Sequence, residues 1–302
     1  MQVLEAAVAA NPWPLRRERA AELAERYPHA VEMLRLYLAL TVVQEAAYLA
    51  NPPPPLAGGT QGIYPSPARG GGQGGGIASL AVEHVMPGVI DATVEVGPRT
   101  LRDGVIAVYA SANLEDMIQR WLDQQPLNPF ETYLARASAS PLLEALTTST
   151  SAISPPPHAG DTHGIYPSPA RGGGQGGGVS QHCPNCGGLP QLSYFAVSGE
   201  ALVSGPRYLV CSRCANNWIF SRMMCAGCGE SNGTKLPIYQ EQEQLPHARV
   251  DGCQTCRKYL LTFDLRRETR AVPIVDEIAG LPLDLYARDQ GLTKITPNLM
   301  GN

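Results

Sequence analysis

Eight cysteines, arranged as four Cys-x-x-Cys pairs, constrain this chain more than any other feature of its sequence. The pairs are Cys183/Cys186, Cys211/Cys214, Cys225/Cys228 and Cys253/Cys256, and no cysteine lies elsewhere. Twenty-four residues separate the first pair from the second, ten separate the second from the third, and twenty-four separate the third from the fourth. This is the spacing of one unit written twice, with two pairs in each unit.

The chemistry that suits this spacing is tetrahedral coordination of a metal ion by four thiolates. A Cys-x-x-Cys turn points two sulfurs at one ion, and two such turns complete a closed S4 site. Gly187 and Gly229 each follow the second cysteine of a pair, and they suit the turn because glycine adopts positive φ without steric cost. We therefore expect two S4-coordinated ions. The spacing leaves iron and zinc open, since both accept tetrahedral sulfur.

The matched gaps favour a sequential assignment of the pairs to the two ions. One ion would be held by Cys183, Cys186, Cys211 and Cys214, and the other by Cys225, Cys228, Cys253 and Cys256. An interleaved arrangement, in which the first and third pairs share an ion, stays open. His182 is not expected to be a ligand, because four thiolates already fill the site. Disulfides and a thioredoxin-like pair are disfavoured, since the loops are very small, no secretory signal is evident and a βαβ context is missing.

Composition bounds the remaining functions. A chain of 302 residues corresponds to about two domains, and 44% hydrophobic residues are enough for a core. The net charge is −4, and the stretch from Gln181 onward contains 12 basic and 11 acidic residues. Because no excess of positive charge is present, we expect neither nucleic-acid nor membrane binding. The N-terminus has no basic start and no run of about 18 apolar residues exists, so we expect no signal peptide and no membrane span. Metal-binding thiols indicate a reducing compartment, hence the cytoplasm.

Residues 53–76 and 155–178 are near copies of each other, offset by 102 positions. They differ only at Leu56/His158, Gly59/Asp161 and Gln61/His163. Packing repeats keep their apolar positions and let the others drift, so identity this high does not indicate a structural repeat. We interpret the copies as a mobile coding insertion in exposed loops, and expect them to be disordered. A proline-rich ligand or an arginine-glycine tract for RNA are the functional alternatives.

The first 150 residues show helical patterns. Helices are expected over 14–27 and 98–110, from Asn113 through Leu122, from Asn128-Pro129 onward, and again from Ser140-Pro141 to Leu146. The most regular pattern is an apolar stripe expected to face a neighbour, formed by Val31, Leu34, Leu38, Val42, Ala46 and Leu49. His29 and His84 are isolated and are interpreted as ordinary surface or core residues.

The cysteine region shows strand patterns instead. Strands are expected at Gln191–Val197, Arg207–Val210 and Trp218–Phe220 around the first site, and at Leu236–Tyr239 and Tyr259–Leu265 around the second. Each unit has too little core to fold alone, and about 10–16 kcal/mol of metal binding per site would supply the missing stability. Val275 to Arg288 is expected to be a helix that Pro282 kinks or divides into two short segments.

These patterns predict a multidomain protein, α plus small β. An all-helical domain (1–150, with a disordered insertion at about 52–78) precedes a disordered linker (151–180). Two tandem rubredoxin-like or zinc-ribbon modules follow (181–220 and 221–270), and a C-terminal helix and tail complete the chain (271–302).

The chain resembles the formate dehydrogenase accessory protein family, FdhE. The resemblance lies in Cys-Pro-Asn-Cys-Gly-Gly-Leu-Pro at 183–190, Arg-Tyr-Leu-Val-Cys-Ser-Arg-Cys at 207–214, Asn217-Trp218, and the stretches 225–229 and 251–256. Ala279–Leu285, Pro297-Asn298, Trp121-Leu122 and Asn128-Pro129 look similar too. The copied segments and Pro282 depart from the family pattern.

The resemblance implies a cytoplasmic factor needed for active respiratory formate dehydrogenase. It also implies a helical domain followed by tandem rubredoxin-like modules that bind iron, and a contact with the catalytic subunit of the dehydrogenase. The eight cysteines match the metal-site positions of the family. The oligomeric state stays open, a homodimer included.

Other functions are weighed against this assembly role. A zinc ribbon that binds nucleic acid or protein would use Tyr208, Trp218 and Tyr259 for stacking, but the charge balance argues against nucleic acid. A rubredoxin-like electron-transfer protein is the other alternative. An enzyme is not expected, because a closed S4 site has no open coordination position and no nucleophile–base pair is evident.

Overall fold

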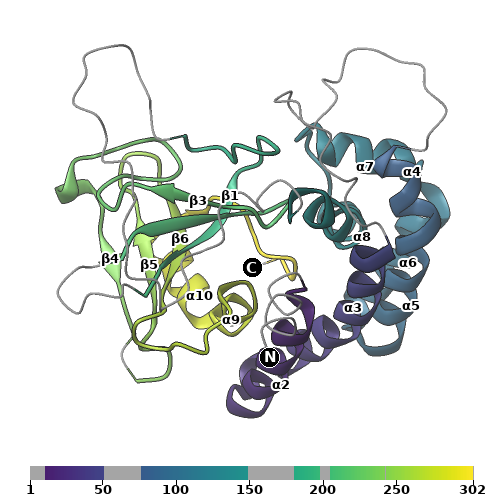
Figure 1. Cartoon of the computed structure of the whole chain (residues 1–302), viewed down its shortest axis with the longest axis horizontal. Coiled ribbons are helices and arrows are strands. Elements are labelled where there is room, and N and C mark those ends of the chain that lie inside the picture. Colours follow the sequence, from purple (N-terminus) through teal and green to yellow (C-terminus); the bar gives the residue numbers. More distant parts are fainter. Residues whose placement is uncertain (1–10, 51–75, 149–179, 198–204, 242, 302) are drawn as a thin grey trace, which may run out of the picture.

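The computed structural model describes residues 11–50, 76–148, 180–197, 205–241 and 243–301. A helical half and a sheet half lie side by side, and the C-terminus lies between them (Figure 1). Both copied segments lie outside the described residues except for Gly76, so their expected disorder stays a prediction.

The helical half is built from the described residues before 149. Its helices are α2 (Trp13–Arg26), α3 (Val31–Ala50), α4 (Ile77–Leu80), α5 (Met86–Val96), α6 (Arg99–Ser111), α7 (Leu114–Leu122) and α8 (Pro129–Thr148). A 3-10 turn (Pro28–Ala30) precedes α3, and a π-helical turn (Ala81–Val85) joins α4 to α5.

Two helix starts follow the capping signals in the sequence. The side chain of Asn113 accepts the backbone N–H of Asp116 at the start of α7. At the start of α8 the Asn128 side chain accepts the N–H of Glu131, and the Glu131 carboxylate accepts the N–H of Asn128. This reciprocal pair is a capping box, so both predicted starts are confirmed.

The prediction of a new helix at Ser140-Pro141 is wrong. Pro141 lies inside α8, which continues to Thr148. A proline has no N–H to donate to the carbonyl four residues back, here that of Ala137. The side chain of Gln44 on α3 donates to that carbonyl at 2.9 Å. A contact from another helix therefore satisfies the acceptor that Pro141 leaves open.

The buried face of α3 also differs from the predicted stripe. Val42 and Leu49 are 62% and 56% exposed, whereas the buried set includes Thr41 and Gln44. Apolar residues occur on all sides of this helix, so periodicity alone did not select the face. Thr41 bonds the Leu38 carbonyl within its own helix, and Gln44 bonds α8.

The sheet half contains one mixed sheet. Its strands are β1 (Pro190–Phe195), β2 (Arg207–Cys211), β3 (Asn217–Phe220), β4 (Ile238–Tyr239), β5 (Ala248–Gly252), β6 (Lys258–Asp264) and β7 (Thr293–Lys294). The order is β3-β2-β1-β6-β5-β4, with β7 on β6. The sequence patterns did not predict β5 and β7.

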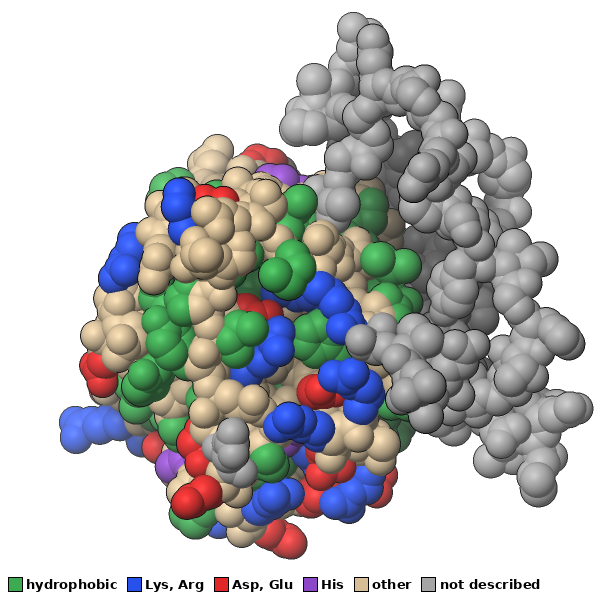
Figure 2. Space-filling model, turned by 90° about the vertical axis from the view of Figure 1, so that its left-hand side faces the viewer, with side chains coloured by type: hydrophobic (Ala, Val, Ile, Leu, Met, Phe, Trp, Pro, Cys, Tyr) green, Lys and Arg blue, Asp and Glu red, His purple; other side chains and the backbone are tan. Residues whose placement is uncertain are grey.

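Parallel pairing of β1 with β6 joins the two cysteine units into that sheet. Leu192 pairs with Leu261 and Phe195 with Asp264, whereas the other pairings within each unit are antiparallel. The two modules expected from the sequence are therefore joined into one sheet by backbone hydrogen bonds between β1 and β6. Figure 2 shows the sheet half, where acidic and basic side chains are interspersed over the lower part of the view and apolar side chains lie across its centre.

Two C-terminal helices follow the sheet. They are α9 (Pro273–Ala279) and α10 (Leu281–Asp289), with Gly280 between them and Pro282 in the first turn of α10. Of the two outcomes expected at Pro282, a kink or a division into two short segments, the structure shows the division. Proline is accepted there because the first N–H groups of a helix have no partner within the helix.

The two halves share a hydrophobic core. Leu23 of α2 and Leu34 of α3 belong to the same buried cluster as Leu261 of β6 and Ile278 of α9. Buried charges cross the same boundary, because Arg19 of α2 forms an ion pair with Asp276 of α9 at 2.5 Å. The domain boundaries expected from the sequence stay predictions.

Two helical stretches pass a length-and-composition test for membrane spans. They are Pro28–Ala50 and Ile77–Val96, with mean hydropathies of 1.2 and 1.3. Core helices of soluble proteins pass the same test. Both stretches contribute buried residues to the helical core, among them Leu36, Leu40, Val85 and Val89.

Candidate metal centres

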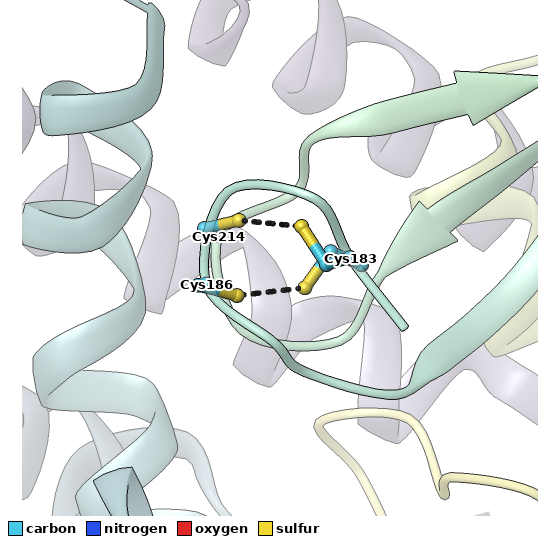
Figure 3. A group of neighbouring side chains, drawn as sticks. Cys183, Cys186 and Cys214 are labelled. Atoms are coloured by element: carbon cyan, nitrogen blue, oxygen red, sulfur yellow. Dashed lines mark hydrogen bonds between the residues drawn. The ribbon is translucent and has the colours of Figure 1, made fainter. Parts of the chain in front are cut away.

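The first cysteine group brings together the pair that precedes β1 and the pair at the end of β2, which meet at the open end of the antiparallel β1–β2 hairpin. The four sulfurs of Cys183, Cys186, Cys211 and Cys214 lie within 4.8 Å of one another. Cys183 Sγ is 3.7 Å from Cys214 Sγ, and Cys186 Sγ is 3.3 Å from Cys211 Sγ. Figure 3 shows the side chains of Cys183, Cys186 and Cys214 pointing toward one another.

The second group has the same construction. The sulfurs of Cys225, Cys228, Cys253 and Cys256 lie within 4.8 Å of one another, and both Cys225–Cys256 and Cys228–Cys253 are 3.7 Å apart. A tetrahedron with metal–sulfur bonds of about 2.3 Å has edges of about 3.8 Å. The spacing of both groups therefore fits one S4-coordinated ion each, and the structure groups the pairs sequentially.

All four Cys-x-x-Cys turns use the same backbone geometry. In each, the N–H of the first cysteine donates to the carbonyl five residues later, at 2.8–2.9 Å: Cys183 to Gly188, Cys211 to Asn216, Cys225 to Glu230 and Cys253 to Lys258. In two of them the N–H two residues on donates to the first sulfur, from Arg213 to Cys211 and from Gly227 to Cys225. These N–H groups stabilise negative charge on sulfur.

The residue after each second cysteine has positive φ. Gly187 and Gly229 have φ of +67° and +78°, as their residue type suggests. Ala215 and Arg257 take the same conformation, at 53° and 58°, without being glycine. The sequence identified only half of these positions, because only half carry the residue that signals the conformation.

The groups differ in burial. Three sulfur-bearing residues of the first group are buried and Cys186 is half-buried, whereas in the second group Cys228 is exposed and Cys256 half-buried. Leu143 of α8 packs in the same cluster as Cys183, Cys211 and Cys214. The first group is thus an interior site, and the second meets solvent.

Thiols this close cannot all ionise freely without a cation. Hydrogen bonds from Cys186, Cys211 and Cys214 hold the pKa of Cys183 well below its ordinary value. The bonds to Cys183 raise the pKa of Cys211 and Cys214. The bond with Cys183 acts to raise the pKa of Cys186, but the bonds with Cys211 and Cys214 outweigh it and lower that pKa. Ionisation of the first pair is therefore favoured at the expense of the second, and four thiolates require a bound positive charge.

The second group is tuned by burial and by backbone donors. Burial raises the pKa of Cys225 and of Cys256. Burial acts in the same direction on Cys253, but the N–H groups of Cys256 and Thr255 outweigh it and lower the pKa of that thiol. A soft divalent ion suits both donor sets, because it replaces these protons.

Two family models match consecutive parts of the chain. Residues 182–222 match the model described as FdhE, central domain, and residues 223–300 match FdhE, C-terminal domain. The boundary falls between the two cysteine groups. Curated relatives named Protein FdhE homolog share 34% identity over 120 residues in Aquifex aeolicus and 32% over 121 residues in Pseudomonas aeruginosa. The cysteine-bearing part of the chain, residues 182–300, is therefore similar to the central and C-terminal domains of FdhE proteins.

The alignments with these FdhE relatives cover only part of each chain. They cover 40% and 39% of this chain, and about two fifths of the relatives, 41% and 38%. The crystal structure of the FdhE protein from Pseudomonas aeruginosa superimposes on this chain with a TM-score of 0.58 and 21% sequence identity. The superposition covers 96% of this chain and 95% of the chain in that crystal structure. The FdhE fold therefore extends across the helical half.

The other residues that the sequence singled out lie outside the sulfur clusters. His182 is exposed, and its Nδ1 lies 3.1 Å from the Gly187 carbonyl. Trp218 and Tyr259 are 8% and 1% exposed, and the Tyr259 hydroxyl donates to Asp284. Tyr208 stacks on Tyr194 with ring centroids 5.3 Å apart. Trp218 and Tyr259 therefore offer no open stacking face to a nucleobase.

Sequence reasoning missed the residues that tie the first group to the helices. Arg213 lies between Cys211 and Cys214, and its guanidinium donates to the Leu122 carbonyl at the end of α7 at 2.6 Å. Thr147 of α8 donates from its hydroxyl to the Cys214 carbonyl at 3.2 Å. No local signal marks these contacts, because both partners are distant in sequence.

Proposed function

We propose that this chain is a cytoplasmic accessory factor in the maturation of formate dehydrogenase, and that it binds the catalytic subunit through a scaffold held by two metal ions. The observation that carries the proposal is the pair of complete S4 groups within the residues that match FdhE, 182–300. The link to formate dehydrogenase comes from the family resemblance.

The metals would hold the sheet half in shape. The residues that would bind them are Cys183, Cys186, Cys211 and Cys214 in the first group, and Cys225, Cys228, Cys253 and Cys256 in the second. Each ion would cross-link two turns that are about 30 residues apart in sequence, at low cost in native strain because the sulfurs already converge. The backbone N–H groups of Arg213 and Gly227 would support thiolate charge.

We infer that the metals are structural or electron-carrying, not hydrolytic. Four sulfurs occupy each group, so a tetrahedral ion has no open position at which to activate water or bind a substrate. The pairs that cross each group, Cys183–Cys214 and Cys225–Cys256, are both 3.7 Å apart, which supports closed coordination in both. Isolated protein is expected to show no turnover of formate.

One observation favours electron transfer as a second candidate function. Cys228 in the second group is exposed, which would bring a redox-active ion close to a partner surface. S4-bound iron cycles between two oxidation states, whereas zinc has no redox chemistry. Iron in the second group with a reversible potential would support this role, and zinc there would exclude it.

The test begins with purification of the full chain without oxygen, metal analysis and a visible spectrum. About two ions per chain are expected, with charge-transfer bands if they are iron. The loaded protein is then used to capture the purified catalytic subunit of formate dehydrogenase. Saturable capture by loaded protein, lost on metal removal, is the expected result.

A matched control separates binding from misfolding. The double variant Cys183→Ser/Cys214→Ser should lose the ion of the first group and should no longer capture the catalytic subunit. The control variant Ser180→Ala, next to the first group but outside it, should keep two ions and full capture. Full capture by protein with no metal would overturn the proposed role of the scaffold. Absence of capture by loaded wild-type protein would overturn the proposed partner.

A further inference from the structure

A cleft of about 510 Å³ lies where the helical half meets the C-terminal tail. Its walls are parts of α6, α7 and α8, residue Ser212 of the first cysteine group, and the tail from Thr296 to Gly301. Figure 1 shows the C-terminus between the two halves of the molecule. Clefts of this size at the junction of two parts of a fold are common binding sites.

One wall of the cleft is apolar and aromatic. Trp121, Leu127 and Phe130 line it, and each is half-buried because one side packs on the helical core while the other faces the cleft. Leu299 and Met300 of the tail face them. Within the described residues nothing covers this surface, so it offers apolar area to an incoming chain.

The cleft also contains one buried cation. Arg136 of α8 is the only formally charged side chain among the described residues of the lining, and it is 8% exposed. Its guanidinium donates to the Pro297 carbonyl at 2.6 Å and to the side chain of Gln191. No described carboxylate lies within salt-bridge distance of Arg136, and the Glu277 carboxylate reaches it only through Gln191, whose amide donates to Glu277. Burial lowers the pKa of Arg136 to about 10, although the Glu277 charge opposes this. A ligand carboxylate in the cleft would give Arg136 a direct ion pair.

The first cysteine group shapes the aromatic wall. The Arg213 guanidinium carbon lies 5.4 Å from the centre of the Trp121 ring, and its Nη2 donates to the Leu122 carbonyl. The backbone N–H of Arg213 donates to Cys211 Sγ. An ion at this group would therefore fix the position of Arg213 and, through it, of Trp121.

We propose that this cleft captures an extended segment of the partner polypeptide that carries apolar side chains and one carboxylate. The inference rests on the proposed function and names the surface for it. The described lining contains no nucleophile–base pair that would act on a small substrate, and apolar walls around one cation fit an acidic, apolar peptide. Metal loading of the first group promotes this capture because it orders Trp121.

The test uses the metal-loaded full chain and the purified catalytic subunit. A benzophenone amino acid in place of Leu127 reports on the cleft, and the same group in place of Val42, which is 62% exposed on α3, is the control. Position 127 is expected to cross-link and position 42 is not. Mass spectrometry of the cross-linked peptide should find apolar residues next to Asp, Glu or a C-terminal carboxylate.

Affinity measurements complete the test. Leu127→Glu, which places a negative charge in the wall, should weaken capture about tenfold or more, whereas Val42→Glu should not. Circular dichroism checks the fold, and Leu127→Ala replaces Leu127→Glu if the latter is unfolded. Unchanged capture by the folded Leu127 variant, with cross-links only from elsewhere, would overturn the cleft and leave the proposed function standing. Absence of capture by wild-type and Val42→Glu protein alike would overturn the proposed function itself.

Discussion

The residue after each second cysteine shows how one backbone angle recurs with different side chains. Gly187 and Gly229 accept positive φ freely, whereas Ala215 and Arg257 hold it against the steric cost of a Cβ atom. In all four turns the hydrogen bond from the N–H of the first cysteine to the carbonyl five residues later holds the backbone in this conformation. The site therefore imposes the conformation, and glycine only lowers its cost.

A pair of reciprocal substitutions measures this cost. Gly187→Ala should destabilise the metal-loaded protein by about 1–2 kcal/mol, because no atom within 4 Å hinders the new Cβ and only φ opposes it. Ala215→Gly occupies the equivalent position and should not destabilise. Urea unfolding of both variants checks the pair, and equal losses in both would contradict the argument.

Gln44 is a single side chain that permits a proline within a helix. Its amide donates to the Ala137 carbonyl, which Pro141 leaves without the usual partner. Gln44 is 3% exposed, so water does not replace it easily. The bond explains why α8 continues through a residue pair that resembles a helix start.

Removal of the Gln44 amide tests this account. Gln44→Met keeps the volume and leaves a buried carbonyl unsatisfied, so the protein should lose about 1–3 kcal/mol of unfolding free energy. Gln119→Met, at a solvent-facing position on α7, is the matched control and should change little. If both variants unfold at the same urea concentration, the bond does not support α8.

At the scale of elements, α9 is fastened to the rest of the fold by Asp276. Its carboxylate accepts from the Arg19 guanidinium, lies 3.0 Å from His247 Nε2, and accepts the backbone N–H of Val272. Burial acts to raise the pKa of Asp276, but these donors outweigh it and lower the pKa. One side chain thus connects α2, the residue that precedes β5 and the start of α9.

The sign of the pH dependence follows from that lowered pKa. The ionised carboxylate is favoured in the folded state, so its contribution is complete above the unfolded pKa of about 3.9 and is lost as the pH falls through the lower folded value. Asp276→Asn should cost about 1.5–3 kcal/mol at pH 7, because buried Arg19 loses the more deeply buried of its two carboxylate partners and keeps only Glu22. It should also flatten the acid side of the stability profile.

Urea unfolding between pH 2 and 7 measures both effects. The exposed Asp91 on α5 provides the control, since Asp91→Asn removes a carboxylate that meets solvent. The account fails if the profile of Asp276→Asn parallels that of the wild-type protein.

At the scale of the whole molecule, the first cysteine group lies at the contact between the halves. Leu143 of α8 packs on its cysteines, Thr147 bonds the Cys214 carbonyl, and Arg213 bonds the end of α7. The second group makes its recorded sulfur contacts within the sheet half and is more exposed. Loss of the ion from the first group should therefore destabilise the helices, whereas loss of the ion from the second group should not.

Hydrogen exchange distinguishes the two groups. Cys211→Ser should lower amide protection in α7 and α8 by about tenfold or more, equivalent to about 1.4 kcal/mol of local stability. Cys228→Ser should lower protection around Cys225–Cys256 and leave α7 and α8 as in the wild-type protein. Equal changes in α7 and α8 for the two variants would contradict a special role of the first group.

The sequence by itself determined the features that depend on close neighbours. It predicted the two sequential cysteine groups, the glycines at two turns, the caps at Asn113 and Asn128, and the division at Pro282, because spacing, φ preference and local hydrogen bonds act within a few residues. The FdhE resemblance followed from the same local stretches.

Only the tertiary structure decided how these pieces meet. The buried face of α3, the continuation of α8 through Pro141, the parallel joining of β1 to β6 and the cleft around Arg136 each depend on a partner far away in the chain. A sequence pattern records which residues favour burial or bonding, but not which distant residue arrives to satisfy them, because that is settled by packing of the whole fold.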